Sequence, residues 1–127
     1  MCRKIISTDH APQAIGPYSQ AVVAGNSVYL SGQIPIDPKS GLVLQEDIKS
    51  QVRLVLENTK AILAAAGCGM EHVVKATIYL KNMSDFAAVN EVYAAEFPTA
   101  PPARATVEVS RLPKDVSVEM DFIAWKE

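Results

Sequence analysis

Residues 48–67, IKSQVRLVLENTKAILAAAG, carry the clearest periodic pattern in the chain. Apolar residues recur there at steps of three and four, from Ile48 to Ala66, which places them on one face of a helix. Gly67 is expected to end that helix. A helix with one apolar face must be covered by a second layer, and the rest of the sequence supplies a β-sheet for this purpose.

A second helix is expected to begin with Ser84 as its cap and to end before Pro98. Its apolar stripe consists of Phe86, Val89, Tyr93 and Phe97. Alternating patterns predict strands at residues 28–31, 73–80, 105–109 and 118–125, and a turn at residues 37–41 predicts a hairpin near the front. This order predicts one α+β domain over residues 1–127, with a mixed β-sheet and both helices packed on one face.

Strand alternation divides the predicted sheet into two faces. The helix-facing set is Ala76, Ile78, Leu80, Ala105, Val107, Val109, Val118, Met120, Phe122 and Ala124. The other face carries Lys75, Thr77, Tyr79, Arg104, Thr106, Glu108, Glu119, Asp121, Ile123 and Trp125. That second face is too apolar for water and too charged for a monomer core, which predicts subunit association over it. A β-bulge would shift these assignments by one residue.

Composition narrows the classes of function. The chain has 127 residues, 12 basic and 14 acidic, with a net charge of −2, so nucleic-acid binding through a basic surface is not expected. It has no apolar stretch as long as a membrane span and no secretion signal, which predicts a cytoplasmic protein. The isolated residues Cys2, Cys68, His10 and His72 form no ligand pattern. We expect no disulfide, metal or cofactor.

Arg104 is the first candidate functional residue. It follows a rigid Pro101-Pro102 pair and stands between two alanines at the start of an apolar strand. A guanidinium in such a place is suited to gripping a planar carboxylate through two parallel hydrogen bonds, so we interpret it as an anion receptor. The alternative is an ion pair with a carboxylate of its own chain or of a neighbouring subunit.

Two further polar residues accompany Arg104. Glu119, predicted on the same face, could orient or deprotonate a water, or it could instead form a salt bridge with Arg104 or Lys75. Asn90 lies within the apolar stripe of the second helix, where its amide needs partners. It could fix a loop, contact a neighbouring subunit or touch a ligand.

Two glycine-containing turns complete the candidate site. Residues 16–20, GPYSQ, place the Tyr18 phenol beside a hydroxyl and an amide, and residues 31–35, SGQIP, expose main chain at Ser31 and Gly32. Glycine lets a ligand approach the backbone closely, and tyrosine offers an apolar wall with a polar tip. Either segment could also be an ordinary turn.

Together these segments resemble the Rid family, also called YjgF/YER057c/UK114. The resemblance covers the whole chain and includes Gly16–Gln20, Ser31–Gln33, Ala66-Gly67, Asn90–Tyr93, Pro102–Val109, Leu112–Asp115 and Val118-Glu119. It is greatest for the RidA clade, the 2-iminobutanoate/2-iminopropanoate deaminases. The resemblance implies a chorismate-mutase-like fold and a homotrimer in which three sheets form a central β-barrel and the sites lie between subunits.

The same resemblance implies roles for individual residues. Arg104 would hold the substrate carboxylate and Glu119 would position the hydrolytic water. The pocket would be lined by Tyr18, Ser31, Gly32, Asn90 and Thr106, the last at a place where some relatives carry cysteine. The implied reaction is hydrolysis of reactive 2-imino acids to 2-keto acids and ammonia. A non-catalytic carboxylate-binding or regulatory protein, including the RNA-cleaving, translation-inhibiting and chaperone-like roles of some relatives, is the alternative.

Overall fold

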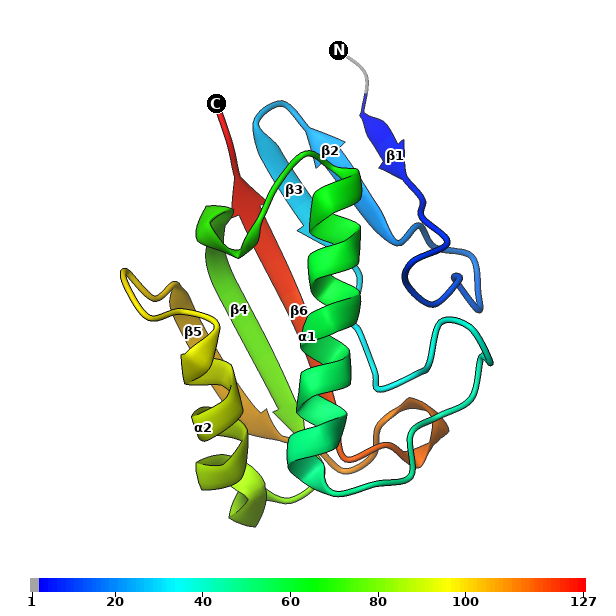
Figure 1. Ribbon diagram of the computed structural model, residues 1–127, viewed down its shortest axis with the longest axis vertical. Coiled ribbons are helices and arrows are strands. Elements are labelled where there is room, and N and C mark those ends of the chain that lie inside the picture. Colours follow the sequence, from blue (N-terminus) through cyan, green and yellow to red (C-terminus); the bar gives the residue numbers. More distant parts are fainter. Residues whose placement is uncertain (1–2) are drawn as a thin grey trace.

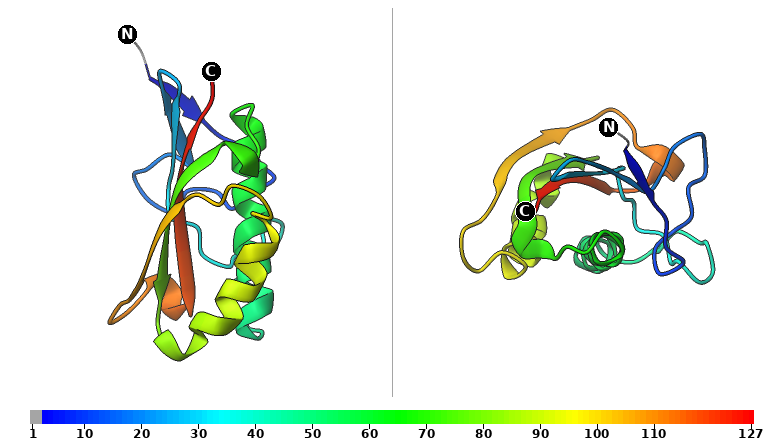
Figure 2. Two further views of the ribbon diagram at one scale, coloured as in Figure 1. Left: turned by 90° about the vertical axis from the view of Figure 1, so that its left-hand side faces the viewer. Right: turned by 90° about the horizontal axis from the view of Figure 1, so that it is seen from above.

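The computed structural model describes residues 3–127 as a sheet with two helices on one side (Figure 1, Figure 2). The strands are β1 (Lys4–Ile6), β2 (Ala21–Ala24), β3 (Ser27–Leu30), β4 (Val73–Leu80), β5 (Ala103–Glu108) and β6 (Val118–Trp125). The helices are α1 (Ile48–Ala65) and α2 (Phe86–Ala95). The strand order is β1-β2-β3-β6-β4-β5, and only β4 and β5 pair in parallel. The predicted α+β architecture with a mixed sheet is confirmed.

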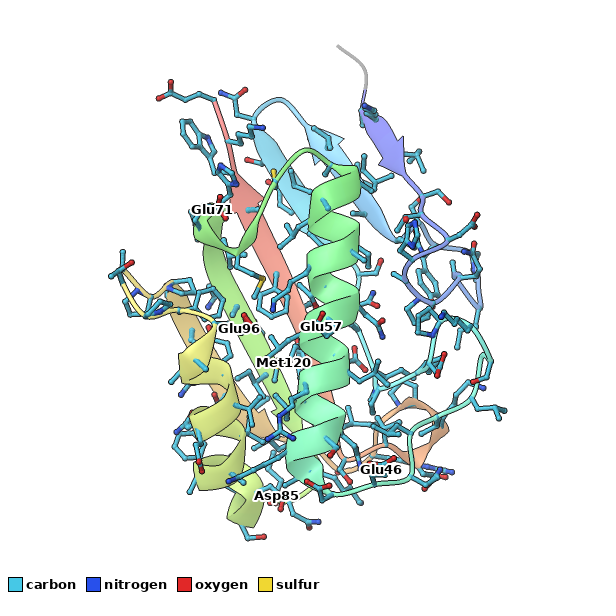
Figure 3. All side chains as sticks on the ribbon, in the orientation of Figure 1. Glu46, Glu57, Glu71, Asp85, Glu96 and Met120 are labelled. Carbon is cyan, nitrogen blue, oxygen red and sulfur yellow. The ribbon has the colours of Figure 1, made fainter. Side chains whose placement is uncertain are left out.

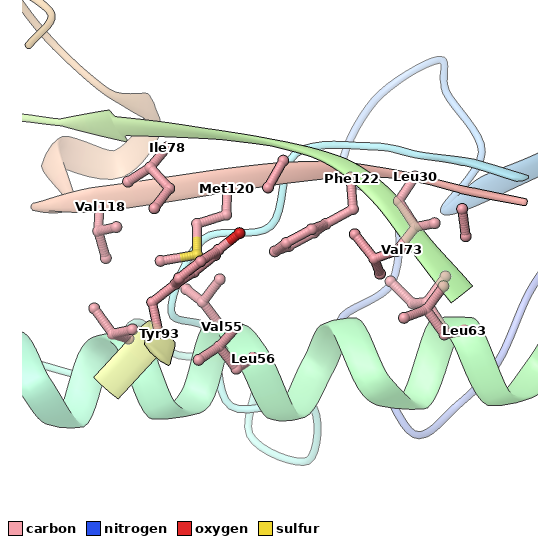
Figure 4. Close-up of a cluster of buried hydrophobic side chains, with 14 of the residues drawn as sticks. Leu30, Val55, Leu56, Leu63, Val73, Ile78, Tyr93, Val118, Met120 and Phe122 are labelled. Carbon is pink, nitrogen blue, oxygen red and sulfur yellow. The ribbon is translucent and has the colours of Figure 1, made fainter. Parts of the chain in front are cut away.

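The core lies between α1 and the sheet. Alternate residues of β6, such as Met120 and Phe122, point toward the apolar face of α1, where Val55 and Leu63 are fully buried (Figure 4). Full burial of a side chain of this size stabilises the fold by about 1.5–3 kcal/mol relative to exposure, so these contacts supply most of the driving force for joining the two layers. The periodicity of residues 48–66 predicted this face correctly.

Both ends of α1 are closed by local interactions. The Asp47 carboxylate accepts hydrogen bonds from the Ser50 backbone N–H at 3.2 Å and from its hydroxyl at 2.8 Å. At the other end Gly67 has a φ of +77°, a left-handed conformation that glycine adopts without steric cost. Its N–H donates to the Ala64 carbonyl, and the Cys68 N–H donates to that of Leu63. Gly67 therefore ends the helix as predicted.

The start of α2 differs from the prediction. Ser84 lies inside a 3-10 turn, Met83–Asp85, and α2 begins after it at Phe86 without a side-chain cap. The segment before α2 is held by a tertiary hydrogen bond, in which the Met83 N–H donates to the Glu108 carboxylate of β5 at 2.7 Å. The predicted serine cap does not form.

Ion pairs link the outer surfaces of the two helices. Lys60 of α1 lies 2.7 Å from Glu96, just beyond the end of α2, and 3.2 Å from Glu57 (Figure 3). Nearby, Lys49 of α1 contacts Glu91 of α2 at 2.7 Å. These pairs connect two helices that already pack on the same sheet, and each exposed pair adds little stability.

The strand predictions were right in the centre of the sheet and incomplete at its edge. β4 and β6 have the predicted bounds, and β3 lies within one residue of them. The strands β1 and β2 were not predicted. The turn at residues 37–41 forms, with the Gly41 N–H donating to the Asp37 carbonyl at 2.8 Å. It is flanked by a single bridge between Ile36 and Val43 and adds no strand to the sheet.

The prediction assigned the side chains of β5 to the wrong faces of the sheet. In the parallel register with β4, Arg104 pairs with the fully buried Ala76 and Thr106 pairs with Ile78, so both side chains lie on the helix side. Val107 pairs with Tyr79, lies on the open side and is 41% exposed. The prediction took the apolar alternation of the strand as pointing inward. On an edge strand next to α2, however, aromatic rings of the helix accept a polar side chain in that position.

The open face of the sheet is otherwise as predicted for β4 and β6. It exposes Tyr29 and Trp125 at 49% and 45%, on the face that also carries the half-buried acidic residues Glu119 and Asp121. Exposed aromatic side chains on a sheet face are typical of a surface that meets another molecule. Within residues 3–127 neither helix has the length and apolarity needed to cross a membrane.

Candidate functional site

A cavity of about 320 Å³ opens beside the end of β3 and contains one part of the predicted site. Its walls are formed by Pro12, Gln13, Ile15, Tyr18, Gln20, Ser31, Gly32, Gln33, Ile34, Ile36, Pro113 and Glu119. The two predicted turns, around Tyr18 and around Ser31, thus lie next to the carboxylate of Glu119 on β6. Four of the predicted site residues, Tyr18, Ser31, Gly32 and Glu119, come together here.

Glu119 packs directly over Gly32. A Cβ atom added at Gly32 would lie 2.0 Å from Glu119 Oε2, so only glycine leaves room for the carboxylate. Burial raises the pKa of Glu119, and the nearby negative charge of Asp121 raises it further. A carboxyl group with a raised pKa in a cavity is suited to accepting and returning a proton.

Hydrogen bonds hold the loops around this carboxylate. The Ser31 hydroxyl donates to the Ser19 carbonyl at 2.5 Å, and the Tyr18 hydroxyl accepts from the Ile15 N–H at 3.2 Å. The buried Gln20 amide donates to the carbonyls of Thr8 and Pro12, which anchors the outer wall. The serine therefore supports the loop, while the tyrosine ring, 47% exposed, remains available to a ligand.

Arg104 lies in a second cluster, between β5 and α2. Its Nη1 donates to Asn90 Oδ1 at 2.7 Å. The guanidinium carbon lies 5.0 Å from the centre of the Tyr93 ring and 5.6 Å from that of Phe86. Thr106, two residues along β5, has a buried hydroxyl with no hydrogen-bond partner in the described chain. Asn90, Arg104 and Thr106 are thus the three predicted residues that gather on the helix side.

The ion-pair alternatives for Arg104 are absent within one chain. Among residues 3–127, no carboxylate lies within salt-bridge distance of Arg104, and Glu119 forms no salt bridge with Lys75. The sequence left three roles open for Asn90: fixing a loop, contacting a subunit or touching a ligand. In the structure, its side chain accepts a hydrogen bond from Arg104. The guanidinium has five N–H donors and gives one of them to Asn90, so it can still bind an anion.

The two clusters lie on opposite sides of the sheet. Glu119 alternates along β6 with the fully buried Val118 and Met120, which places it on the open side, whereas Arg104 shares the helix side with Ala76. The expectation that Arg104 and Glu119 share a face was therefore wrong. One chain therefore carries two separate clusters of candidate residues, which we call half-sites: a carboxylate half around Glu119 in the cavity and a guanidinium half around Arg104 beside α2.

Several residues of these half-sites were not predicted as site residues. Phe86 and Tyr93 had been assigned to the core stripe of α2, although the i, i+7 spacing about Asn90 already places all three on one face. The cavity also uses Pro12, Gln13 and Pro113. No motif marks these, because they reach the cavity through loop conformation and not through periodic structure.

A mixed sheet under two helices, with a carboxylate in a cavity on one side and an arginine held by an amide on the other, defines a class of small two-layer α+β proteins. A family model described as Endoribonuclease L-PSP matches residues 8–126. The chain belongs to this family, the YjgF or Rid family, as its sequence motifs had indicated.

Individual relatives cover nearly the whole chain. A RutC family protein of Pyrococcus horikoshii is 58% identical over 125 residues, which are 98% of this chain and 99% of the relative. The 2-iminobutanoate/2-iminopropanoate deaminase of Salmonella typhimurium is 52% identical over 124 residues, 95% of this chain and 96% of the relative. The crystal structure of E. coli TdcF with bound serine superimposes with a TM-score of 0.92 at 46% identity, covering 98% and 99% of the two chains.

Proposed function

We propose that this protein is an imine deaminase that hydrolyses 2-imino acids, such as 2-iminobutanoate and 2-iminopropanoate, to 2-keto acids and ammonia. The observation that carries the proposal is the guanidinium of Arg104, which is held by Asn90 and has no carboxylate partner among residues 3–127. Every 2-imino acid presents a carboxylate that this group can grip. The deaminase of Salmonella typhimurium at 52% identity supports the same reaction.

In this proposal, the active site lies between the subunits of a homotrimer. A single chain separates Arg104 and Glu119 by the thickness of its sheet, so one substrate cannot reach both within it. The exposed aromatic groups of the open face, Tyr29 and Trp125, favour burial against neighbouring copies. In the trimer, the guanidinium half of one subunit meets the carboxylate half of the next around a common substrate.

The chemistry then follows from the two halves. Arg104 binds the carboxylate of the protonated imino acid and fixes the imine carbon next to Glu119. Glu119 accepts a proton from water while the water oxygen bonds to that carbon and the C=N electron pair moves to nitrogen. It then returns the proton to nitrogen, the C–N bond breaks, and the hydroxyl proton leaves with ammonia as ammonium. The raised pKa of Glu119 suits both transfers.

A coupled assay tests this function. A threonine dehydratase supplied with threonine produces the imino acid, semicarbazide traps the free imine, and 2-ketobutyrate formation is followed with and without the purified protein. We expect faster ketobutyrate formation with the wild type and none of this acceleration with Arg104→Ala. If Arg104→Ala accelerated ketobutyrate formation as much as the wild type does, Arg104 would have no role in binding the substrate carboxylate.

The second candidate function is a protein that binds small carboxylates without turnover. The serine bound in E. coli TdcF, an amino acid with no imine to hydrolyse, favours keeping this candidate. Calorimetry with 2-ketobutyrate separates the two functions. Arg104-dependent binding without acceleration of the coupled assay would indicate the binding protein, and binding together with acceleration the enzyme.

A further inference from the structure

Three residues of α2 meet Arg104 on one side of the helix. Phe86, Asn90 and Tyr93 are separated by four and three residues, the spacing that aligns side chains along a helical face. Asn90 Oδ1 accepts the hydrogen bond from Nη1, and both rings lie within 6 Å of the guanidinium carbon. Thus one helix contacts the arginine through an amide and two aromatic rings.

These contacts restrict the rotation of the Arg104 side chain without neutralising its charge. An ion pair would neutralise Arg104 and compete with an incoming anion, but a ring attracts the cation through its quadrupole and occupies no N–H donor. The amide of Asn90 is neutral and takes a single donor. The side chain of arginine also has much rotational freedom to lose on binding, and a restricted side chain loses less of it when a ligand arrives.

Tyr93 is the buried member of this set. It is 5% exposed, and its hydroxyl is buried without a hydrogen-bond partner in the described chain. Figure 4 shows the side chain reaching from α2 toward Met120 in the core. A buried hydroxyl without a partner does not stabilise the fold, so the contribution of this residue must come from its ring.

We propose that Phe86 and Tyr93 are positioning residues that, with Asn90, set the plane of the Arg104 guanidinium before the carboxylate binds. The ring faces do this without neutralising the cation, so that the arginine meets its ligand both oriented and fully charged. For its kinetic consequences this inference rests on the proposed function. Its structural content concerns the free protein and can be measured without turnover.

Nuclear magnetic resonance of the free protein tests the structural part. The chain has four arginines, Arg3, Arg53, Arg104 and Arg111, so their Nε–Hε signals are few, and Arg104→Lys assigns the signal of interest. We expect the Arg104 Hε signal to be displaced by ring currents from those of the other three. It should stay displaced in Tyr93→Phe and move toward the others in Tyr93→Leu and Phe86→Leu.

Kinetics and ligand binding test the consequence. Tyr93→Leu should raise KM about tenfold while kcat changes by less than about twofold, because the arginine then binds ground state and transition state equally less well. The Tyr93→Phe variant should restore the wild-type KM. Val89→Ala is the matched control, because Val89 is a buried residue of the same helix that makes no contact with Arg104 among those described. This variant should lose stability and keep KM.

The outcomes separate this inference from the proposed function. An undisplaced Arg104 signal in the wild type, or a displacement that survives Tyr93→Leu, would overturn the positioning role whether or not the protein is a deaminase. A displaced signal that depends on both rings, in a protein without deaminase activity, would support the positioning role and refute the enzyme. Equal KM values for Tyr93→Leu and Tyr93→Phe would also overturn it.

Discussion

The two half-sites of this protein are built in different ways. The guanidinium half is held by one helix, whose amide and rings contact Arg104 from regular structure. The carboxylate half is held by loops, with Glu119 lying over Gly32 in a cavity that raises its pKa. The guanidinium half therefore holds its cation without an ion pair among residues 3–127, whereas burial in the carboxylate half disfavours the charged form of Glu119. A cation that must stay charged and a carboxyl group that must exchange protons need these opposite environments.

The largest effect is expected at the guanidinium half. Arg104→Ala should lower kcat/KM of the coupled deaminase assay by about 100-fold or more, since it removes a two-pronged charged contact. Arg104→Lys should retain only a small part of the wild-type kcat/KM, because an ammonium is a point charge and cannot replace the planar guanidinium with its two parallel hydrogen bonds. Thermal unfolding should change little in either variant. Full recovery by lysine would mean that charge alone matters and that the orientation by α2 is irrelevant.

The next effect is expected at the carboxylate half. Gly32→Ala would bring a Cβ to 2.0 Å from Glu119 Oε2, so the carboxylate must move. We expect kcat to fall about tenfold or more while the unfolding temperature stays nearly constant, because a misplaced proton acceptor slows the chemical step.

Gly69→Ala provides a matched control for that variant. It creates a similar approach, 2.1 Å, to the exposed carboxylate of Glu71, which can move into solvent. Its activity should equal that of the wild type. Unchanged kcat in Gly32→Ala would show that the position of Glu119 is not used, and the contrast between the two half-sites would lose its functional meaning.

A smaller effect concerns stability against pH. The pKa of Glu119 is raised in the folded state, so folding binds a proton there, and stability from this group is present at low pH and lost as pH rises through the raised pKa. Glu119→Gln should therefore unfold at a higher temperature than the wild type near pH 7. The difference should disappear below the ordinary glutamate pKa of about 4.3.

Glu91→Gln is the opposite case. Lys49 lowers the pKa of Glu91 on the exposed helix surface, so this substitution should give no stabilisation at neutral pH. Equal responses of the two glutamine variants to pH would contradict the environment assigned to Glu119.

The smallest effect is expected between the helices. Lys49 and Glu91 form a pair at 2.7 Å, but their side chains are 37% and 70% exposed. Replacing Lys49 by alanine should change the free energy of unfolding by less than about 1 kcal/mol, because solvent screens such pairs. Deaminase activity should stay at the wild-type level. A large loss of activity would mean that the orientation of Arg104 depends on the helix pair and not on the face of α2.

The sequence predicted the parts of the molecule in which burial enforces a period. The helix that ends before Gly67 and the strand at residues 118–125 are buried on one side along their length. The strand at residues 73–80 is buried on one side from Ala76 onward, after an irregular register between Val73 and Lys75. Arg104 and Glu119 were recognised because charged groups are costly within apolar strand sequences. These parts needed no knowledge of the tertiary structure.

The failures occurred where tertiary contacts replace local rules. β5 is an edge strand, partly exposed on both sides, so its apolar alternation did not identify the buried side. The register with β4 and the rings of α2 decided that side instead. β1 is short, and Ser84 lies inside a 3-10 turn, so it does not cap α2. The split of the site into two halves follows from the phase of β5 and could not be predicted without it.

The claim that neighbouring subunits supply the two half-sites of one active site is tested by subunit mixing. Arg104→Ala and Glu119→Gln are each expected to be inactive, and the two proteins are unfolded together, refolded and analysed by native mass spectrometry and the coupled assay. In random mixed trimers about one site in four combines an intact arginine with an intact carboxylate, so about a quarter of wild-type activity should return. Mixed trimers that form and remain inactive would contradict the claim.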